Sequence, residues 1–168
     1  RKRSIRYTPI SGIWQTVWLE TVPAAWISGL KLVPDVAAGA LRVKVIGNGK
    51  SEDKVDAVAS AGGKEIARAT GEAGKELVLP IKDAHLWSPE DPFLYDLKVT
   101  WGKDCVASYF GMRSITVGKD EKGILRPLLN GKFVMQCGLL DQGYWPDGLF
   151  TAPADEALKY DLEMTRKL

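Results

Sequence analysis

The sequence contains few of the side chains that metal, thiol or imidazole chemistry requires. Its 168 residues include one histidine, His85, and two cysteines, Cys105 and Cys137. A structural zinc site uses four Cys or His ligands, and a hydrolytic triad uses histidine as its base. No CxxC pair, P-loop or G-x-S-x-G motif occurs. We therefore expect no metal site and no cofactor, and we expect His85 to form a hydrogen bond within its own loop.

The two cysteines lie in apolar, strand-like surroundings. An unpaired cysteine behaves as a small apolar residue and is usually buried. We therefore expect buried free thiols, although the sequence leaves open whether Cys105 and Cys137 pair with each other.

An excess of either charge and a long apolar run are also missing. The chain has 23 basic and 21 acidic residues, interspersed, for a net charge of +2. A nucleic-acid-binding domain normally carries a strong basic patch, and a membrane-spanning helix needs about 20 consecutive apolar residues. We expect neither nucleic acid nor a membrane as partner, and we interpret the short basic run Arg1–Arg6 as a frayed terminus.

Short segments of alternating apolar and polar residues, separated by glycine-rich turns, fill most of the chain. With 45% hydrophobic residues, the sequence can form a substantial core. Alternation of this kind is typical of antiparallel sheets with one solvated face, and regular turn signals favour a β-sandwich. The sequence predicts strands over residues 23–35, 41–46, 54–60, 64–69, 76–81, 95–101 and 105–117.

The segment His85–Leu97 joins the two halves of this pattern and contains two prolines. Proline removes a backbone donor and biases the preceding residue toward extended geometry, so a helix or a central strand is excluded. Its large apolar side chains nevertheless require burial. We therefore predict a crossover in which Trp87, Leu94 and Tyr95 anchor a core and Glu90–Asp91 form a solvated tip.

Several features near the two ends of the chain suggest buried surroundings. Ile13–Val22, which includes Trp14, and Val134–Leu140 are apolar on both faces, which predicts buried strands. Asn130-Gly131 predicts a hairpin between strands at 125–129 and 132–136.

A helix is predicted over Pro153–Leu168, and its apolar stripe requires a partner. We expect this region to fold back on the sandwich or to pair with a second copy of the chain. The stripe comprises Ala154, Ala157, Leu158, Leu162 and Leu168.

Four segments, in the same order along the chain, resemble glycoside hydrolase family 2, the β-galactosidase and β-glucuronidase family. They are Ser11–Glu20, the crossover sequence LWSPEDPFLYDL, Tyr109–Ile115 and Leu128–Leu149. The resemblance implies an immunoglobulin-like sandwich over residues 23–118. It further implies that residues 1–22 end a preceding sugar-binding domain, and that residues 119–168 are a hairpin and the first strand and helix of a truncated (β/α)8 barrel.

The resemblance places the chemistry outside this chain. Family members hydrolyse terminal β-linked sugars through a covalent glycosyl-enzyme, using two glutamates on later barrel strands. Those strands are expected beyond Leu168, so we assign no catalytic residue and expect an inert segment whose partners are the remaining domains. The resemblance favours a bacterial periplasmic or secreted protein, and the sequence itself does not determine the compartment. The alternative is a free-standing sandwich that binds glycans or proteins.

Two groups of residues are candidates for contacts in the longer enzyme. The loop after the first barrel strand opens on the side of a barrel's active site, so its polar and aromatic side chains are candidates for sugar binding. These residues are Asp141, Gln142, Tyr144 and Trp145. Alternatively, Tyr144 and Trp145 pack the seam between sandwich and barrel. Phe110 and Arg113 match the family's domain junction, where we favour a structural role for the arginine.

Overall fold

The computed structural model describes residues 11–13 and 15–168, which divide into two units. The first unit, Thr21–Met135, contains strands β1 to β10. The second unit combines Gln136–Leu168 with the described residues up to Glu20, and it contains the helix α1 (Asp155–Lys167).

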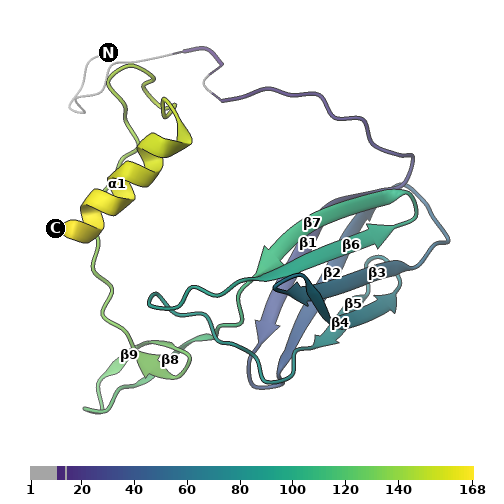
Figure 1. The fold of residues 1–168 in the computed structure, drawn as a ribbon, viewed down its shortest axis with the longest axis horizontal. Helices are drawn as coiled ribbons and strands as arrows, with labels where there is room; N and C mark the ends of the chain where they lie inside the picture. The colour runs from purple at the N-terminus through teal and green to yellow at the C-terminus, as the bar shows by residue number, and fades with distance from the viewer. Residues whose placement is uncertain (1–10, 14) are drawn as a thin grey trace. The chain divides into compact units, whose positions relative to one another are not determined.

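Seven strands of the first unit form an antiparallel, immunoglobulin-like β-sandwich (Figure 1). One sheet has the order β1-β2-β5, and the facing sheet has the order β4-β3-β6-β7. The predicted strands and turns of this region are confirmed, with small changes in their ends. The bounds are β1 Trp26–Asp35, β2 Ala40–Asn48, β3 Val55–Ala61, β4 Lys64–Gly71, β5 Glu76–Pro80, β6 Tyr95–Trp101 and β7 Asp104–Phe110.

Alternation along the central strands produces the core. In β2, Leu41, Val43 and Val45 are 0% exposed, and the residues between them point outward. In the other sheet, Ala57 of β3 lies directly opposite Val99 of β6, and both are 0% exposed. The buried residues of β3, β5 and β6 are Val55, Ala57, Ala59, Leu77, Leu79, Tyr95, Leu97, Val99 and Trp101.

The predicted long strand over residues 105–117 is interrupted. It ends at Phe110, and a new strand, β8 (Ile115–Lys119), follows the linker at residues 111–114. Met112 in this linker is fully buried and forms a parallel bridge with Leu86 of the crossover. The linker therefore leaves the sheet because it pairs with the crossover instead.

Strands β8, β9 (Leu125–Leu129) and β10 (Lys132–Phe133) form a separate antiparallel sheet. The predicted turn at Asn130-Gly131 is confirmed, with both residues at positive φ, although β10 is shorter than expected. On one face of this sheet Leu128 is buried against Gly118. The opposite face, which we call the hairpin face, carries the exposed apolar residues Ile115, Val117, Leu125 and Pro127. The exposed Lys119, opposite Leu125, and the half-buried Leu129, opposite Ile115, lie on the same face.

Two predicted strands are absent, and both predictions were wrong for this chain. The described residues of Ile13–Val22 and the segment Val134–Leu140 have no strand assignment, and Leu19 and Leu140 are 96% and 87% exposed. Trp14 lies outside the described residues. A strand exists only where a neighbouring chain completes its hydrogen-bond ladder. The described structure pairs neither segment, so their apolar residues remain in solvent.

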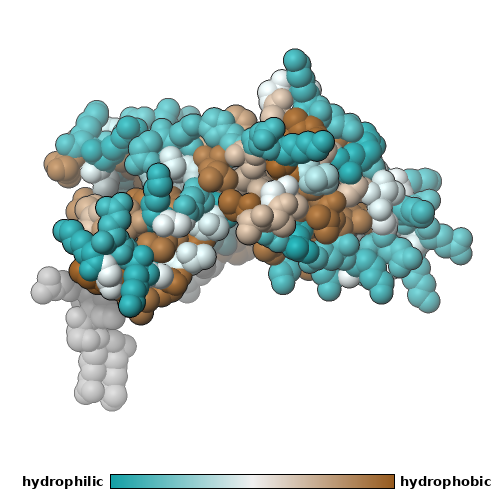
Figure 2. Space-filling view, turned by 90° about the horizontal axis from the view of Figure 1, so that it is seen from below, coloured by the Kyte–Doolittle hydropathy of each residue, from teal (hydrophilic) through white to brown (hydrophobic). Residues whose placement is uncertain are grey.

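The predicted helix is confirmed as α1, but its apolar stripe is exposed. No residue of α1 is buried, and Leu162 is 73% exposed. Acidic residues lie in its first turn and basic residues in its last turn, where both interact favourably with the helix dipole. The surface of the described chain accordingly mixes polar and apolar regions, and Figure 2 shows brown apolar atoms interrupting the teal polar surface.

The expectation of buried thiols was also wrong. Cys105 and Cys137 are both free and exposed. Cys105 lies on β7, an edge strand whose alternate side chains point to solvent. Its position in the alternation, rather than its apolar neighbours in sequence, determines its exposure.

Candidate functional site

The single histidine lies in the crossover and forms contacts within it. The His85 backbone N–H donates to the Tyr95 hydroxyl at 2.7 Å, and the His85 Nε2 atom lies 2.5 Å from Asp91 Oδ2. The His85 ring stacks on Phe93 with centroids 4.3 Å apart. Asp91 is exposed at the tip, as predicted. These contacts stabilise the loop, so His85 has a structural role within the crossover.

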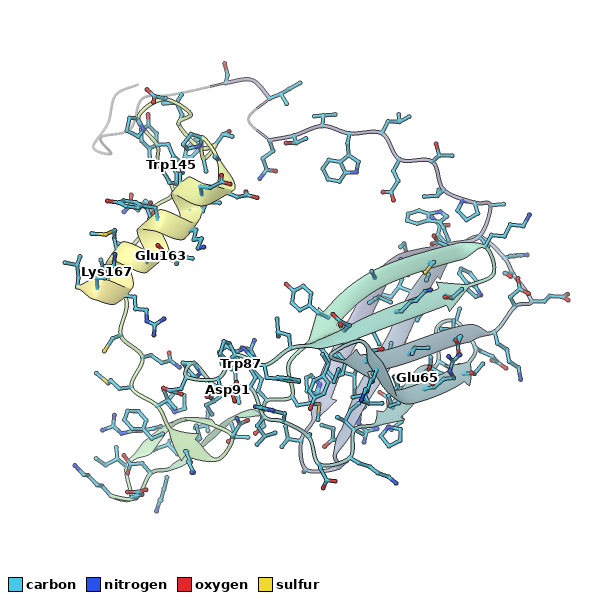
Figure 3. All side chains as sticks on the ribbon, viewed as in Figure 1. Glu65, Trp87, Asp91, Trp145, Glu163 and Lys167 are labelled. Carbon is cyan, nitrogen blue, oxygen red and sulfur yellow. The ribbon has the colours of Figure 1, made fainter. Side chains whose placement is uncertain are left out.

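Trp87 is the centre of contacts between the crossover and the linker. Its backbone N–H donates to Met112 O at 2.9 Å, and the Arg113 guanidinium lies 4.5 Å from the centroid of its ring. A Cβ atom at Gly111 would lie 3.2 Å from the Trp87 Cβ, so a glycine permits this close packing. Trp87 is half-buried, and Figure 3 labels it on the crossover beside Asp91. It therefore anchors the junction more than the sandwich core.

The other two predicted anchors differ from each other. Tyr95 is 4% exposed and stacks on Phe110 with ring centroids 5.1 Å apart. Leu94 is 48% exposed, so the prediction that it lies in the core was wrong. Tyr95 begins β6 with its side chain inward, and the alternation then directs its neighbour Leu94 outward.

A shallow groove of ≈ 610 Å³ lies beside this junction. Its lining includes Leu32, Trp87, Leu94, Tyr109, Arg113 and Ile115. Phe110 also lines the groove, although it is 4% exposed and belongs to the core. The groove is mainly apolar, with one exposed guanidinium, and it contains no carboxylate that could act as an acid or base.

A second open hollow, of ≈ 1030 Å³, lies at one end of the sandwich. Its lining includes lysines and carboxylates, and its one aromatic residue, Trp101, is 4% exposed. A sugar normally stacks on an exposed aromatic face. The ring of Trp101 is covered by the sandwich, so this hollow offers no such platform.

The loop predicted to contact sugar lies in the second unit, and its residues make separate local contacts. Asp141 and Gln142 are exposed, and Asp141 Oδ1 accepts a hydrogen bond from Gly143 N at 2.7 Å. Tyr144 packs edge-on against Phe150 with ring centroids 5.8 Å apart. Trp145 exchanges two backbone hydrogen bonds with Leu149, of 2.7 and 3.1 Å. Figure 3 labels Trp145 on this loop, which precedes α1.

Paired carboxylates occur on the sandwich surface, but an arginine separates each pair. The Arg42 guanidinium donates to Asp35 at 2.9 Å and to Glu76 at 2.9 Å. Arg68 likewise joins Asp56 and Glu65. A retaining glycosidase leaves the space between its two carboxylates for the sugar and needs one of them protonated. In both pairs a guanidinium fills that space.

Hydrogen bonds lower the pKa of three surface carboxyl groups, Asp35, Glu65 and Asp120. The Ala38 N–H and then Arg42 lower the pKa of Asp35, and Arg68 lowers the pKa of Glu65. The pKa of Asp120 is lowered by the Ile124 N–H and by Arg126. A general acid requires the opposite shift, so none of these three carboxylates suits that role.

Stability is expected to decrease when these carboxylates are protonated. A carboxyl group whose pKa is lower in the folded state contributes stability above its unfolded value, about 4, and loses it as the pH falls through the folded value. We expect the urea midpoint to be steady above about pH 5 and to fall from there toward pH 2. Asp120→Asn should make this fall shallower, and an equally steep fall in that variant would contradict the assignment.

Among residues 11–13 and 15–168, no three His, Cys, Asp or Glu side chains cluster closely enough to hold a metal ion. No helix in the described part of the chain is long and apolar enough to cross a membrane.

Comparison with protein families determines what kind of chain this is. The family described as Glycosyl hydrolases family 2 matches residues 25–113, which is more than half of the chain and coincides with the sandwich. The chain belongs to glycosyl hydrolase family 2. The resemblance inferred from four sequence segments is therefore confirmed.

Solved structures of β-glucuronidase from Ruminococcus gnavus share the fold of this family 2 chain. The complex with a C6-substituted uronic isofagomine has a TM-score of 0.71 and 20% identity, and the match covers 86% of this chain and 24% of that one. The complex with D-glucuronic acid gives 0.71 and 20%, with 86% and 25% covered. The apo structure gives 0.70 and 18%. No curated protein sequence matches the chain.

The family 2 chain thus spans about a quarter of the length of the β-glucuronidases that it matches.

One residue where the crossover, the linker and the hairpin meet was not recognised from the sequence. Asn130 was interpreted only as a turn residue, but its side chain contacts both the linker and the crossover. The Asn-Gly dipeptide indicates the turn, and nothing in the sequence indicates the partners of the side chain.

Proposed function

We propose that this chain is a non-catalytic sandwich segment of a longer family 2 enzyme, which hydrolyses terminal β-O-glycosides with retention. In this proposal residues 1–22 end a preceding domain, residues 23–118 form the sandwich, and residues 119–168 begin the catalytic barrel. The sandwich acts as a spacer and as an interface for the neighbouring domains. The catalytic pair of glutamates is contributed by the rest of the enzyme.

One observation carries the interface role. The hairpin face presents Ile115, Val117 and Leu125, which are 71%, 73% and 68% exposed, on one side of a small sheet. Ile115 also lines the junction groove, so the two apolar surfaces are continuous. Exposed apolar patches of this kind are typical of surfaces that bind another protein surface.

The same reasoning extends to the second unit. Leu158, Leu162 and Leu168 of the stripe are exposed, as are Asp141 and Gln142 of the loop, whereas Tyr144 and Trp145 are half-buried. The helix by itself has little to stabilise it. We propose that barrel neighbours cover the stripe and that Asp141, Gln142, Tyr144 and Trp145 face the sugar in the complete enzyme. In their absence the stripe is available to a second copy of the chain.

The proposal is tested by comparing this chain with the longer protein on aryl β-glycosides, including a β-glucuronide and a β-galactoside. We expect turnover from the longer protein and none from residues 1–168. Turnover by the shorter chain that survives repurification and is abolished by a substitution within it would overturn the non-catalytic assignment.

Val117→Arg tests the interface separately. In residues 1–168 this exposed position should tolerate arginine, with a change in unfolding free energy within about 0.5 kcal/mol. In the longer protein the same change buries an unpaired charge, so thermal stability and turnover should both fall. Lys119→Arg, on the same strand, serves as the control that retains its charge. Equal stability of the two variants in the longer protein would show that the hairpin face is not covered.

A further inference from the structure

Three segments that are far apart in the sequence meet at one side chain. The crossover contributes Trp87, the linker contributes Ser114, and the hairpin turn contributes Asn130. Asn130 accepts a hydrogen bond from Ser114 N through Oδ1 at 2.9 Å and donates from Nδ2 to Trp87 O at 3.0 Å. Its own backbone N–H donates to Ser114 O at 2.9 Å.

The chemistry of the partners fixes the orientation of the carboxamide. Ser114 N–H is a donor, so it must face the amide oxygen, and Trp87 O is an acceptor, so it must face the amide nitrogen. Neither aspartate nor glycine can supply both at neutral pH, because aspartate has no donor and glycine has no side chain. Asparagine also tolerates the positive φ of 50° that this turn position adopts.

We propose that Asn130 is a positioning residue whose carboxamide locks the crossover, the linker and the hairpin into one rigid junction. The hairpin face is then held at a fixed orientation to the sandwich. Backbone hydrogen bonds already join the linker to the crossover, through Trp87 N and Met112 O, and the hairpin turn to the linker, through Asn130 N and Ser114 O. The bond from Asn130 Nδ2 to Trp87 O adds a direct link between the hairpin turn and the crossover, which restricts the angle of the hairpin to the sandwich. This inference concerns the chain itself, and it stands or falls independently of the activity proposed for the longer enzyme.

Asn130→Gly separates the turn from the lock. Glycine adopts positive φ readily, so the hairpin should still form. Losing the carboxamide should accelerate hydrogen exchange at the Ser114 amide about tenfold or more, because its hydrogen bond is removed. Residual dipolar couplings should show β8 and β9 reoriented against β3 and β6. Asn48→Gly, at an exposed asparagine near the end of β2, should change neither measurement.

Asn130→Asp tests whether the side chain acts as a donor to Trp87 O, because a residue that only forms the turn would show no dependence on pH. At pH 7 the new carboxylate still accepts from Ser114 N but faces the Trp87 carbonyl without a donor, so the lock should open. Protonation restores an O–H donor toward that carbonyl. The dipolar couplings should therefore return toward the wild-type values as the pH falls from about 6 to 4, around and above the ordinary aspartate pKa.

Wild-type protein measured over the same pH range controls for other carboxylates. Unchanged Ser114 exchange and unchanged couplings in Asn130→Gly would overturn the proposal and reduce Asn130 to a turn residue. An Asn130→Asp variant that keeps wild-type couplings at pH 7, or that never recovers them at lower pH, would contradict the donor role toward Trp87.

Discussion

Replacing Trp101 with alanine is expected to lower the free energy of unfolding by about 3–5 kcal/mol. Trp101 ends β6 with 4% of its surface exposed, and its Nε1–H donates to Asp53 O at 3.0 Å. Its ring also lies against Gly47 of the facing sheet, where a Cβ atom would be 2.5 Å from Cζ3. The side chain therefore fills one end of the sandwich and contacts both sheets. Truncation loses this burial and leaves a cavity.

Urea denaturation followed by circular dichroism measures the effect. Trp18→Ala is the matched control, because Trp18 is 75% exposed and its replacement should change the unfolding free energy by less than about 0.5 kcal/mol. A loss of less than about 1 kcal/mol for Trp101→Ala would mean that the two sheets close over the gap, contrary to the tight packing seen at Gly47.

Leu41→Ala is expected to cost about 2–5 kcal/mol. Leu41 is 0% exposed at the start of β2, the central strand of its sheet, and lies opposite Leu79 of β5. Removing its branched end opens a cavity between two strands that cannot shift independently. The expected result is a lower urea midpoint with an unchanged slope, because the surface exposed on unfolding stays nearly the same.

Leu125→Ala is the matched control for the same chemical change. Leu125 belongs to the hairpin face and is 68% exposed, so its truncation in residues 1–168 should cost less than about 0.5 kcal/mol. A cost equal to that of Leu41→Ala would show that the hairpin face is already covered within this chain, which would contradict its role as an exposed interface.

The sandwich could be predicted from the sequence because each of its strands has a local pattern of alternating apolar residues. In β2 and β6 every second residue is apolar, and this alternation requires one buried face whatever lies around it. The turn at Asn130-Gly131 was predicted for a similar reason, since the preference for positive φ is local.

The predictions that failed concern segments whose structure depends on a neighbour. Val134–Leu140 is apolar enough for a buried strand, but a strand without a pairing partner does not form. Leu94 was expected in the core from its hydrophobicity, and the register of β6 turns it outward. The lock at Asn130 could not be predicted, because it joins positions 43 residues apart that share no pattern.

The strand order also influences the order and the rate of the steps by which this chain folds. The pairs β3–β4, β6–β7 and β8–β9 are local hairpins, which form within about 1–10 μs. The pairing of β3 with β6 instead requires the whole segment between Ala61 and Tyr95 to close, and such non-local pairing limits the folding of all-β domains to about milliseconds to seconds. The local hairpins are therefore expected to form first, and the pairing of β3 with β6 is expected to be the slow step. The hydrogen bonds between Asn130 and Ser114 extend the local β8–β9 hairpin and can form early. The bond from Asn130 to Trp87 O joins positions 43 residues apart, so we expect the contact between hairpin and crossover to be a later event in folding.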